Sequence, residues 1–201
     1  MSFEKYLINK KALIITLDGA LYPKKDYLLQ VYYLFSEFMA YSEQLDSKAM
    51  IEFMSIEYAE NGEEEIFNKT ATQFGIPESY KHNFNLLHET ARLPLKLLLF
   101  KQVLELLQEA VMDRVQIFII AEGNLAEAIN KIKQIEWHGL QEYLKVYFMA
   151  EYNDIVIDAL TAILKDGKVE KDDAVLFIAP EQLNDNFTKF NIDCYSVSNI
   201  L

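Results

Sequence analysis

The sequence predicts an α/β protein with a doubly wound parallel sheet and a helical domain inserted after the first strand. Two observations support this: five short apolar runs alternate with helical patterns, and an unusually long interval separates the first run from the second. The chain has 201 residues, of which 51% are hydrophobic and 25% charged. This composition is typical of a folded globular protein and not of a disordered one.

The five apolar runs cover residues 12–16, 115–121, 146–150, 174–179 and 194–197. Their apolar residues are continuous and do not alternate with polar ones, as expected of parallel strands buried on both faces. Alternation of strands and helices predicts right-handed crossovers in a doubly wound sheet.

Helices are predicted between the later strands from their start signals. Asn124 is a candidate N-cap for a helix that ends near Ile135, and Asn153 for a helix that ends near Leu164. Pro180 stands where the first turn of a helix extending to about Phe190 would begin.

The first and second runs begin at residues 12 and 115, which is farther apart than one crossover requires. The intervening stretch has no strand-like run and predicts four helices, over 25–44, 47–59, 63–74 and 78–90. Turn signals separate them at 61–62 and 75–77. We therefore predict a core domain of residues 1–20 and 93–201 and a helical cap domain of residues 21–92.

Charge and composition limit the partners. A formal net charge of −12 argues against a nucleic acid or an anionic membrane, because both require a basic surface. The charged N-terminus does not resemble a secretory signal, and the apolar stretch near residue 100 is interrupted by Lys96, Lys101 and Glu105. The single cysteine, Cys194, excludes an internal disulfide and is expected to be a buried, inert thiol. We expect an acidic cytoplasmic protein.

A ligand crevice in such a sheet lies beyond the carboxyl ends of the strands. The predicted strand ends carry the acids Asp18, Glu122, Glu151 and Glu181, and no lysine, arginine or histidine. Oxygen ligands of this kind suit a hard divalent cation. Alternatively, several of these acids point to solvent from loop ends. A bound phosphate is disfavoured in either case, because nearby carboxylates would repel it.

Four segments together resemble the haloacid-dehalogenase-like (HAD) hydrolase superfamily. Residues 13–23 have the sequence LIITLDGALYP, similar to the family's first motif, an apolar strand ending in Asp-x-Asp-Gly-Thr-Leu. Residues 115–124, 175–180 and 190–197 resemble the family's second strand, its fourth motif and its last loop and strand. The resemblance implies a Rossmann-like HAD core, and the helical insert matches the family's first cap position.

The resemblance also implies that most of the catalytic side chains are missing. The position of the nucleophilic aspartate holds Thr16, whereas Asp18 matches the second, acid/base aspartate. Ala121 replaces the phosphate-binding threonine or serine, and Pro180 replaces the metal-binding aspartate. The family's lysine after the third strand has no counterpart in residues 151–154. Because the nucleophile and the fourth-motif aspartate supply anionic metal ligands, these losses form a consistent set.

We therefore predict no catalytic residues, no cofactor and no metal, and a pseudoenzyme that binds a protein partner or a small molecule. The alternative is a divergent metal-assisted HAD-like hydrolase that uses Asp18, Glu122, Glu151 and Glu181. Under that alternative Mg²⁺ would be held by Asp18, Glu181 and Asp185, the last of which, or Asn184, matches a downstream acidic position.

The first helix of the insert is apolar around most of its circumference, more than one buried stripe requires. Its apolar residues are Tyr27, Leu28, Val31, Tyr32, Leu34, Phe35, Phe38, Met39 and Tyr41, with further aromatic residues at Tyr33, Phe53 and Tyr58. Either the helix is sandwiched between its neighbours and the core, or it forms a homodimer or partner surface, where Tyr and Phe are favoured.

Overall fold

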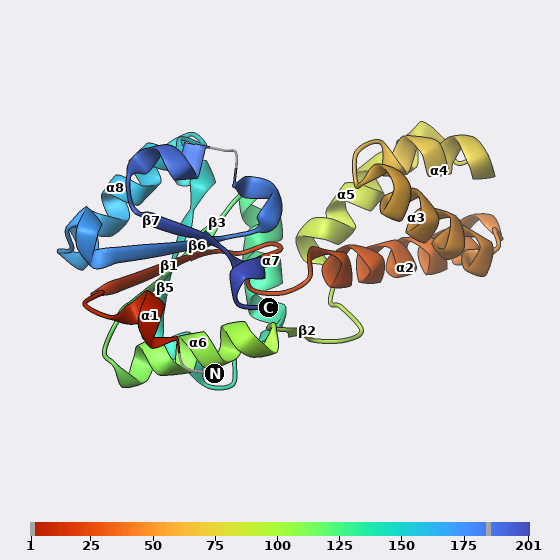
Figure 1. Cartoon of the computed structure of the whole chain (residues 1–201). Helices are drawn as coiled ribbons and strands as arrows, with labels where there is room; N and C mark the ends of the chain where they lie inside the picture. The colour runs from red at the N-terminus through yellow and green to blue at the C-terminus, as the bar shows by residue number, and fades with distance from the viewer. Residues whose placement is uncertain (1–2, 184–185) are drawn as a thin grey trace.

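The computed structural model describes residues 3–183 and 186–201. Its central sheet has five parallel strands in the order β5-β3-β1-β6-β7, as predicted for a doubly wound α/β core (Figure 1). The strands are β1 (Ala12–Thr16), β3 (Gln116–Ala121), β5 (Leu144–Phe148), β6 (Ala174–Ile178) and β7 (Asp193–Ser196). Each overlaps one of the five predicted runs, and Thr16, Ala121 and Ile178 end the three central strands.

Both faces of this sheet are buried, which explains why the runs are continuously apolar. On β1, Leu13 and Ile15 belong to one hydrophobic cluster, and Ala12 and Ile14 to another. The first cluster includes residues of α1 (Glu4–Leu7) and α6 (Lys101–Met112), and the second includes residues of α8 (Val156–Gly167). Figure 1 shows α1 and α6 on the opposite side of the sheet from α8.

The insert after β1 is helical, as predicted, and lies beside the sheet (Figure 1). It contains α2 (Lys24–Glu43), α3 (Ser47–Asn61), α4 (Ile66–Phe74), the 3₁₀-helix η1 (Glu78–Tyr80) and α5 (Lys81–Thr90). Phe84 of α5 packs against Phe35 of α2 at 5.1 Å and Phe67 of α4 at 5.6 Å between ring centroids. These aromatic contacts hold the helices of the insert together, within the same hydrophobic cluster that covers one face of the sheet.

Helix α2 packs mainly as a sandwiched helix. It buries Tyr27, Leu28, Val31, Tyr32, Phe35, Ser36 and Met39. Tyr41, by contrast, is 91% exposed, and Tyr33 is also exposed. The homodimer through the aromatic-rich cap stays a prediction. No helix among residues 3–183 and 186–201 combines the length and apolarity that a membrane crossing requires.

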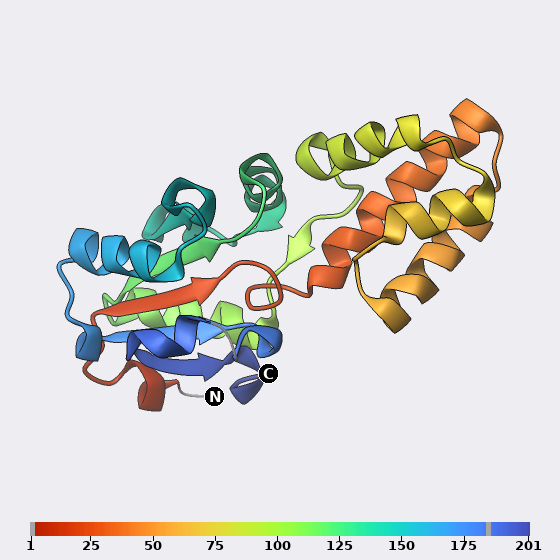
Figure 2. The same ribbon diagram turned by 90° about the horizontal axis from the view of Figure 1, so that it is seen from above.

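Helix α7 (Leu125–Gln134) follows β3 and packs against α5, so it lies between the core and the insert (Figure 2). The predicted N-cap is confirmed, because the Asn124 side chain accepts hydrogen bonds from the backbone N–H groups of Ala126 (2.8 Å) and Glu127 (3.1 Å). Two-residue strands that the sequence pattern did not indicate, β2 (Leu97–Leu98) and β4 (Ile135–Glu136), pair in parallel beside α7.

The N-cap predicted at Asn153 is wrong. Helix α8 begins at Val156, and Asn153 instead ends the 3₁₀-helix η3 (Met149–Tyr152) with a φ of 52°. Asparagine tolerates this left-handed conformation better than most residues, so the turn explains its presence.

The helix predicted from Pro180 is a 3₁₀-helix, η5 (Pro180–Gln182), because its backbone bonds connect residues three apart, as from Gln182 N to Ala179 O (3.0 Å). A further 3₁₀-helix, η6 (Asn186–Phe190), precedes β7. The other short elements are η2 (Leu140–Tyr143), η4 (Lys171–Asp173) and η7 (Val197–Asn199). Cys194 is half-buried in β7, and burial raises the pKa of its thiol.

Candidate functional site

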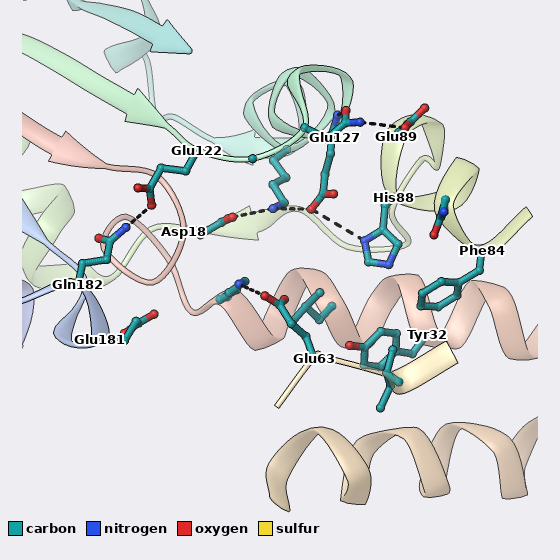
Figure 3. Close-up of a pocket in the computed structure, with 17 residues that line it drawn as sticks. Asp18, Tyr32, Glu63, Phe84, His88, Glu89, Glu122, Glu127, Glu181 and Gln182 are labelled. Atoms are coloured by element: carbon teal, nitrogen blue, oxygen red, sulfur yellow. Dashed lines mark hydrogen bonds and ion pairs between the residues drawn. The ribbon is translucent and has the colours of Figure 1, made fainter. Parts of the chain in front are cut away.

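A cavity of about 600 Å³ lies where the strand ends of the core face the helical insert (Figure 3). Its location agrees with the crevice expected at the carboxyl ends of parallel strands. The core contributes Asp18, Glu122, Gly123, Asn124, Glu127, Lys131, Glu181 and Gln182, and the insert contributes Lys24, Leu28, Tyr32, Glu63, Ile66, Phe84, Asn85, His88 and Glu89.

Gln182 joins the ends of the three central strands. The Thr16 hydroxyl at the end of β1 donates a hydrogen bond to Gln182 Oε1 (2.8 Å), which also accepts from Ala179 N after β6 (2.9 Å). Gln182 Nε2 donates to the Glu122 carboxylate after β3, as Figure 3 shows. Thr16 is only 1% exposed as a result. Thr16, which the resemblance aligns with the nucleophile, is therefore a buried, neutral side chain that is hydrogen-bonded within the chain.

Asp18 is held by a donor on each carboxylate oxygen. Tyr22 donates its hydroxyl to Oδ1 (2.5 Å), and Lys131 Nζ lies 2.6 Å from Oδ2. Burial, and next the Asp18 charge, raise the pKa of the Tyr22 hydroxyl, so this residue stays a hydrogen-bond donor. Both carboxylate oxygens of Asp18 are therefore engaged within the chain.

Lys131 is a buried cation that the sequence interpretation missed. It projects from α7, its side chain is 5% exposed, and its Nζ lies 2.6 Å from Glu127 as well as from Asp18. The ammonium also stands 4.6 Å from the centre of the Tyr27 ring. A signal was present, because Lys131 occupies the buried face of α7 at helical spacing from Ala128 and Gln134, where a lysine requires a partner.

Two more basic side chains reach the cavity from the insert, and neither follows a strand. Lys24 of α2 pairs with Glu63 at 2.5 Å. His88 of α5 places Nδ1 3.9 Å from Glu127 Oε1. Burial lowers the pKa of His88, which favours the neutral imidazole at pH 7. The expectation of a crevice without lysine or histidine was therefore wrong, because it considered only the strand ends.

Three of the four predicted acids, Asp18, Glu122 and Glu181, line the cavity. Glu151 does not: it is exposed in η3, after β5. The reason is the strand order, since β5 is an edge strand separated from β1 by β3.

Glu181 lies against the loop that follows β1. Its Oε1 stands 2.9 Å from the point where a Cβ on Gly19 would lie, and Gly19 has a φ of 72°. A side chain at position 19 would therefore meet both a strained backbone and the Glu181 carboxylate.

Ala121 ends β3, and Pro180 follows β6 by two residues, so both lie near the carboxyl ends of central strands. Ala121 is the last residue of β3 and is 1% exposed, and Pro180 begins η5. Neither has a side-chain oxygen for a phosphate or a metal ion.

The described residues of the crevice do not fit a Mg²⁺ ion, which requires near-octahedral oxygen ligands. Within the described part of the chain, no three His, Cys, Asp or Glu side chains lie close enough together to hold a metal. Thr16 and Asp18 already direct their oxygens to partners in the chain. The predicted alternatives Asn184 and Asp185 lie outside the described residues.

The cavity wall is strongly acidic. It contains six carboxylates and two lysines, a formal excess of four negative charges with His88 neutral. The N-terminus of α7 does not offset this excess for an anion, because the Asn124 side chain occupies the N–H groups of Ala126 and Glu127. A phosphate is therefore electrostatically disfavoured in this cavity.

Solved structures of HAD-like hydrolases share this fold. A Thermotoga maritima protein assigned as a beta-phosphoglucomutase superimposes with a TM-score of 0.58 at 15% identity, over 95% of this chain and 96% of its own. An L-2-haloacid dehalogenase does so with a TM-score of 0.56 at 11% identity, over 92% and 85%. A HAD family hydrolase from Deinococcus radiodurans, with bound phosphate and sodium, has a TM-score of 0.50 at 15% identity, over 84% and 72%.

Neither a protein-family model nor a curated protein sequence matches the chain. At identities this low the structural likeness shows the fold alone. The chain therefore has the HAD-like hydrolase fold, with an α/β core and an N-terminal helical region that corresponds to a cap.

Proposed function

We propose that this protein is a non-catalytic representative of the HAD-like fold that binds a small molecule in the crevice between sheet and insert. The observation that carries the proposal is the hydrogen bond between the Thr16 hydroxyl and the Gln182 side chain. The Thr16 hydroxyl, at the position that the resemblance gives to the nucleophile, is buried and donates a hydrogen bond to the Gln182 amide oxygen. An amide oxygen accepts a hydrogen bond but is no base, so it cannot activate this hydroxyl for attack.

The surroundings of Thr16 support the same proposal. A hydroxyl nucleophile requires an adjacent general base, and the carboxylate oxygens of Asp18 already accept from Tyr22 and Lys131. Loss of the nucleophile in a well-studied hydrolase lowers turnover by a factor on the order of 10⁶. The acidic wall disfavours a phosphoester substrate, whereas a cavity of about 600 Å³ is ample for a small molecule.

The test is a phosphatase assay of the full chain with p-nitrophenyl phosphate and Mg²⁺ at pH 7. We expect no turnover above the protein-free blank. Turnover that EDTA abolishes, and that disappears in Asp18→Ala but persists in Asp113→Ala, would overturn the proposal. Asp113 is the matched control because it is an exposed aspartate at the end of α6, outside the crevice. Circular dichroism establishes that each variant is folded.

A further inference from the structure

The insert side of the crevice carries an unsatisfied polar group, the hydroxyl of Tyr32. Tyr32 is fully buried on α2 and lines the cavity, with its ring stacked 6.1 Å from that of Phe84. Within residues 3–183 and 186–201, its hydroxyl is the one buried side-chain oxygen or nitrogen without a hydrogen-bond partner. Because an unpaired buried hydroxyl is unfavourable, it points to a partner that the described residues do not supply.

The Tyr32 hydroxyl remains protonated at neutral pH. Burial raises its pKa, and the charge of Glu63 raises it further. A neutral phenol can both donate a hydrogen bond and accept one, so it suits a hydroxyl or an amine. Figure 3 shows Tyr32 and Glu63 on the insert side of the cavity, across from Glu181 and Asp18.

The carboxylates that line the cavity outnumber its lysines by four. Lys24 pairs with Glu63, and Lys131 pairs with both Asp18 and Glu127. Glu89 accepts a hydrogen bond from Asn124 (3.1 Å), but neither Glu89 nor Glu181 forms an ion pair with a described residue. A cationic ligand would lower the electrostatic energy of this wall.

The arrangement of the acids fits an extended organic cation better than a metal ion. No three of the described acids gather around one point, so a compact divalent ion would lack ligands. Between the acids, Leu28, Ile66 and Phe84 give the cavity apolar surface for a hydrocarbon chain.

We propose that the crevice binds a small aliphatic amine with polar groups at both ends. One protonated amine lies beside Glu181 at the sheet edge, the hydrocarbon chain packs along Leu28 and Ile66, and the second polar group pairs with the Tyr32 hydroxyl. This inference rests on the proposed function, since a working phosphatase would have to admit a phosphate to the same crevice.

The experiment is calorimetric titration of the full chain at pH 7 and low salt with three probes of equal length. These are 1,4-diaminobutane, the neutral 1,4-butanediol and, as the anion, succinate. We expect saturable binding of the diamine at least tenfold tighter than the diol, and no binding of succinate. Equal affinity for diamine and diol, or no diamine binding, would overturn the amine assignment.

Two single-residue variants distinguish diamine binding at this site from non-specific attraction of a cation to an acidic protein. We expect Glu181→Gln to weaken diamine binding about tenfold, as one charged hydrogen bond is worth roughly that factor. The matched control is Glu142→Gln, an exposed acid in η2 outside the cavity, which should leave the affinity unchanged. Equal weakening by both variants would mean that the diamine binds non-specifically and would overturn the proposal.

Tyr32→Phe tests the hydroxyl without opening a cavity. We expect several-fold weaker diamine binding with no loss of thermal stability, because the hydroxyl has no partner among the described residues. Unchanged diamine affinity in this folded variant would contradict the proposed hydrogen bond between the ligand and the Tyr32 hydroxyl. If amine binding fails while the phosphatase assay stays negative, the amine inference falls and the non-catalytic proposal stands. Magnesium-dependent turnover in the phosphatase assay would instead contradict the proposal that the protein is non-catalytic.

Discussion

The two walls of the crevice differ in how their polar side chains are satisfied. On the sheet side, Thr16, Gln182 and Glu122 hydrogen-bond to one another, and Asp18 accepts from Tyr22 and Lys131. On the insert side, the Tyr32 hydroxyl has no partner among the described residues. Groups that are paired within the chain have little capacity left for a ligand, whereas an unpaired buried group gains free energy when a ligand reaches it.

The two walls also differ in how the charges of their carboxylates are compensated. Lys131 pairs with both Asp18 and Glu127, so these two carboxylates share one positive charge from within the chain. On the sheet side, Thr16, Gln182, Glu122 and Asp18 belong to a structural network, whereas Glu181 forms no ion pair with a described residue. The insert-side wall keeps the features of a binding surface, namely aromatic rings, carboxylates and a free hydroxyl.

The strongest test of the contrast is Thr16→Asp, which restores the family's nucleophile residue. We expect no recovered hydrolysis and a loss of about 3–5 kcal/mol of unfolding free energy at pH 7, since the site offers a new carboxylate no free donor. Burial should raise the pKa of that carboxyl in the folded state. The penalty should therefore be largest at pH 7 and shrink as the pH falls toward 4, because it is lost between the raised folded pKa and the unfolded value of about 3.9.

Urea unfolding of Thr16→Asp at pH 7 and pH 4 measures this effect, with the uncharged Thr16→Asn as the control for shape. If both variants are equally stable at pH 7, the wall around Thr16 is more open to water or cations than its hydrogen bonds indicate. Phosphatase activity in Thr16→Asp alone would show that the metal ligands lie elsewhere.

Lys131→Met should have the next largest effect. Removing the ammonium leaves Asp18 and Glu127 facing each other without a counter-charge, and breaking a buried pair costs about 3–5 kcal/mol. Because both carboxylates are about a quarter exposed, solvent screening should reduce the loss to about 2–3 kcal/mol.

The control for Lys131→Met is Lys101→Met, whose lysine is 85% exposed and pairs with Glu105 at 3.9 Å. We expect it to change the unfolding free energy by less than about 0.5 kcal/mol. Adding Asp18→Asn to Lys131→Met should recover part of the loss in urea unfolding. A double variant no more stable than Lys131→Met would show that the two side chains are not energetically coupled.

The smallest effect concerns His88 on the insert-side wall. Burial lowers the pKa of His88, so the unfolded chain takes up a proton more readily than the folded one. Its contribution to stability is therefore present above the unfolded value of about 6.5 and is lost as the pH falls below it. Between pH 7 and pH 5, the wild type should lose more unfolding free energy than His88→Gln.

The comparison for this pH dependence is His82→Gln, which replaces an exposed histidine on the same helix. That variant should retain the wild-type pH dependence of urea unfolding. Identical pH profiles for wild type and His88→Gln would mean that Glu127, 3.9 Å away, compensates the protonated imidazole fully.

The sequence alone determined the fold and the location of the crevice. Strands buried on both faces require continuous apolar runs, and an insert after the first strand lengthens the interval between the first two runs. Both features can be recognised along the sequence without knowledge of long-range contacts. The N-cap at Asn124 and the acids Asp18, Glu122 and Glu181 follow from position in the chain, because the carboxyl ends of neighbouring parallel strands meet at one edge.

Only the tertiary structure decided which side chains meet there. Lys131, Tyr22 and His88 come from a helix, a loop and the insert, and no strand end marks them. Glu151 follows a strand but lies away from the crevice, because the strand order places β5 at the edge of the sheet. Whether a polar group has a hydrogen-bond partner depends on which distant segments of the chain meet in the folded protein. Thr16 finds such a partner in Gln182, whereas the Tyr32 hydroxyl finds none among the described residues.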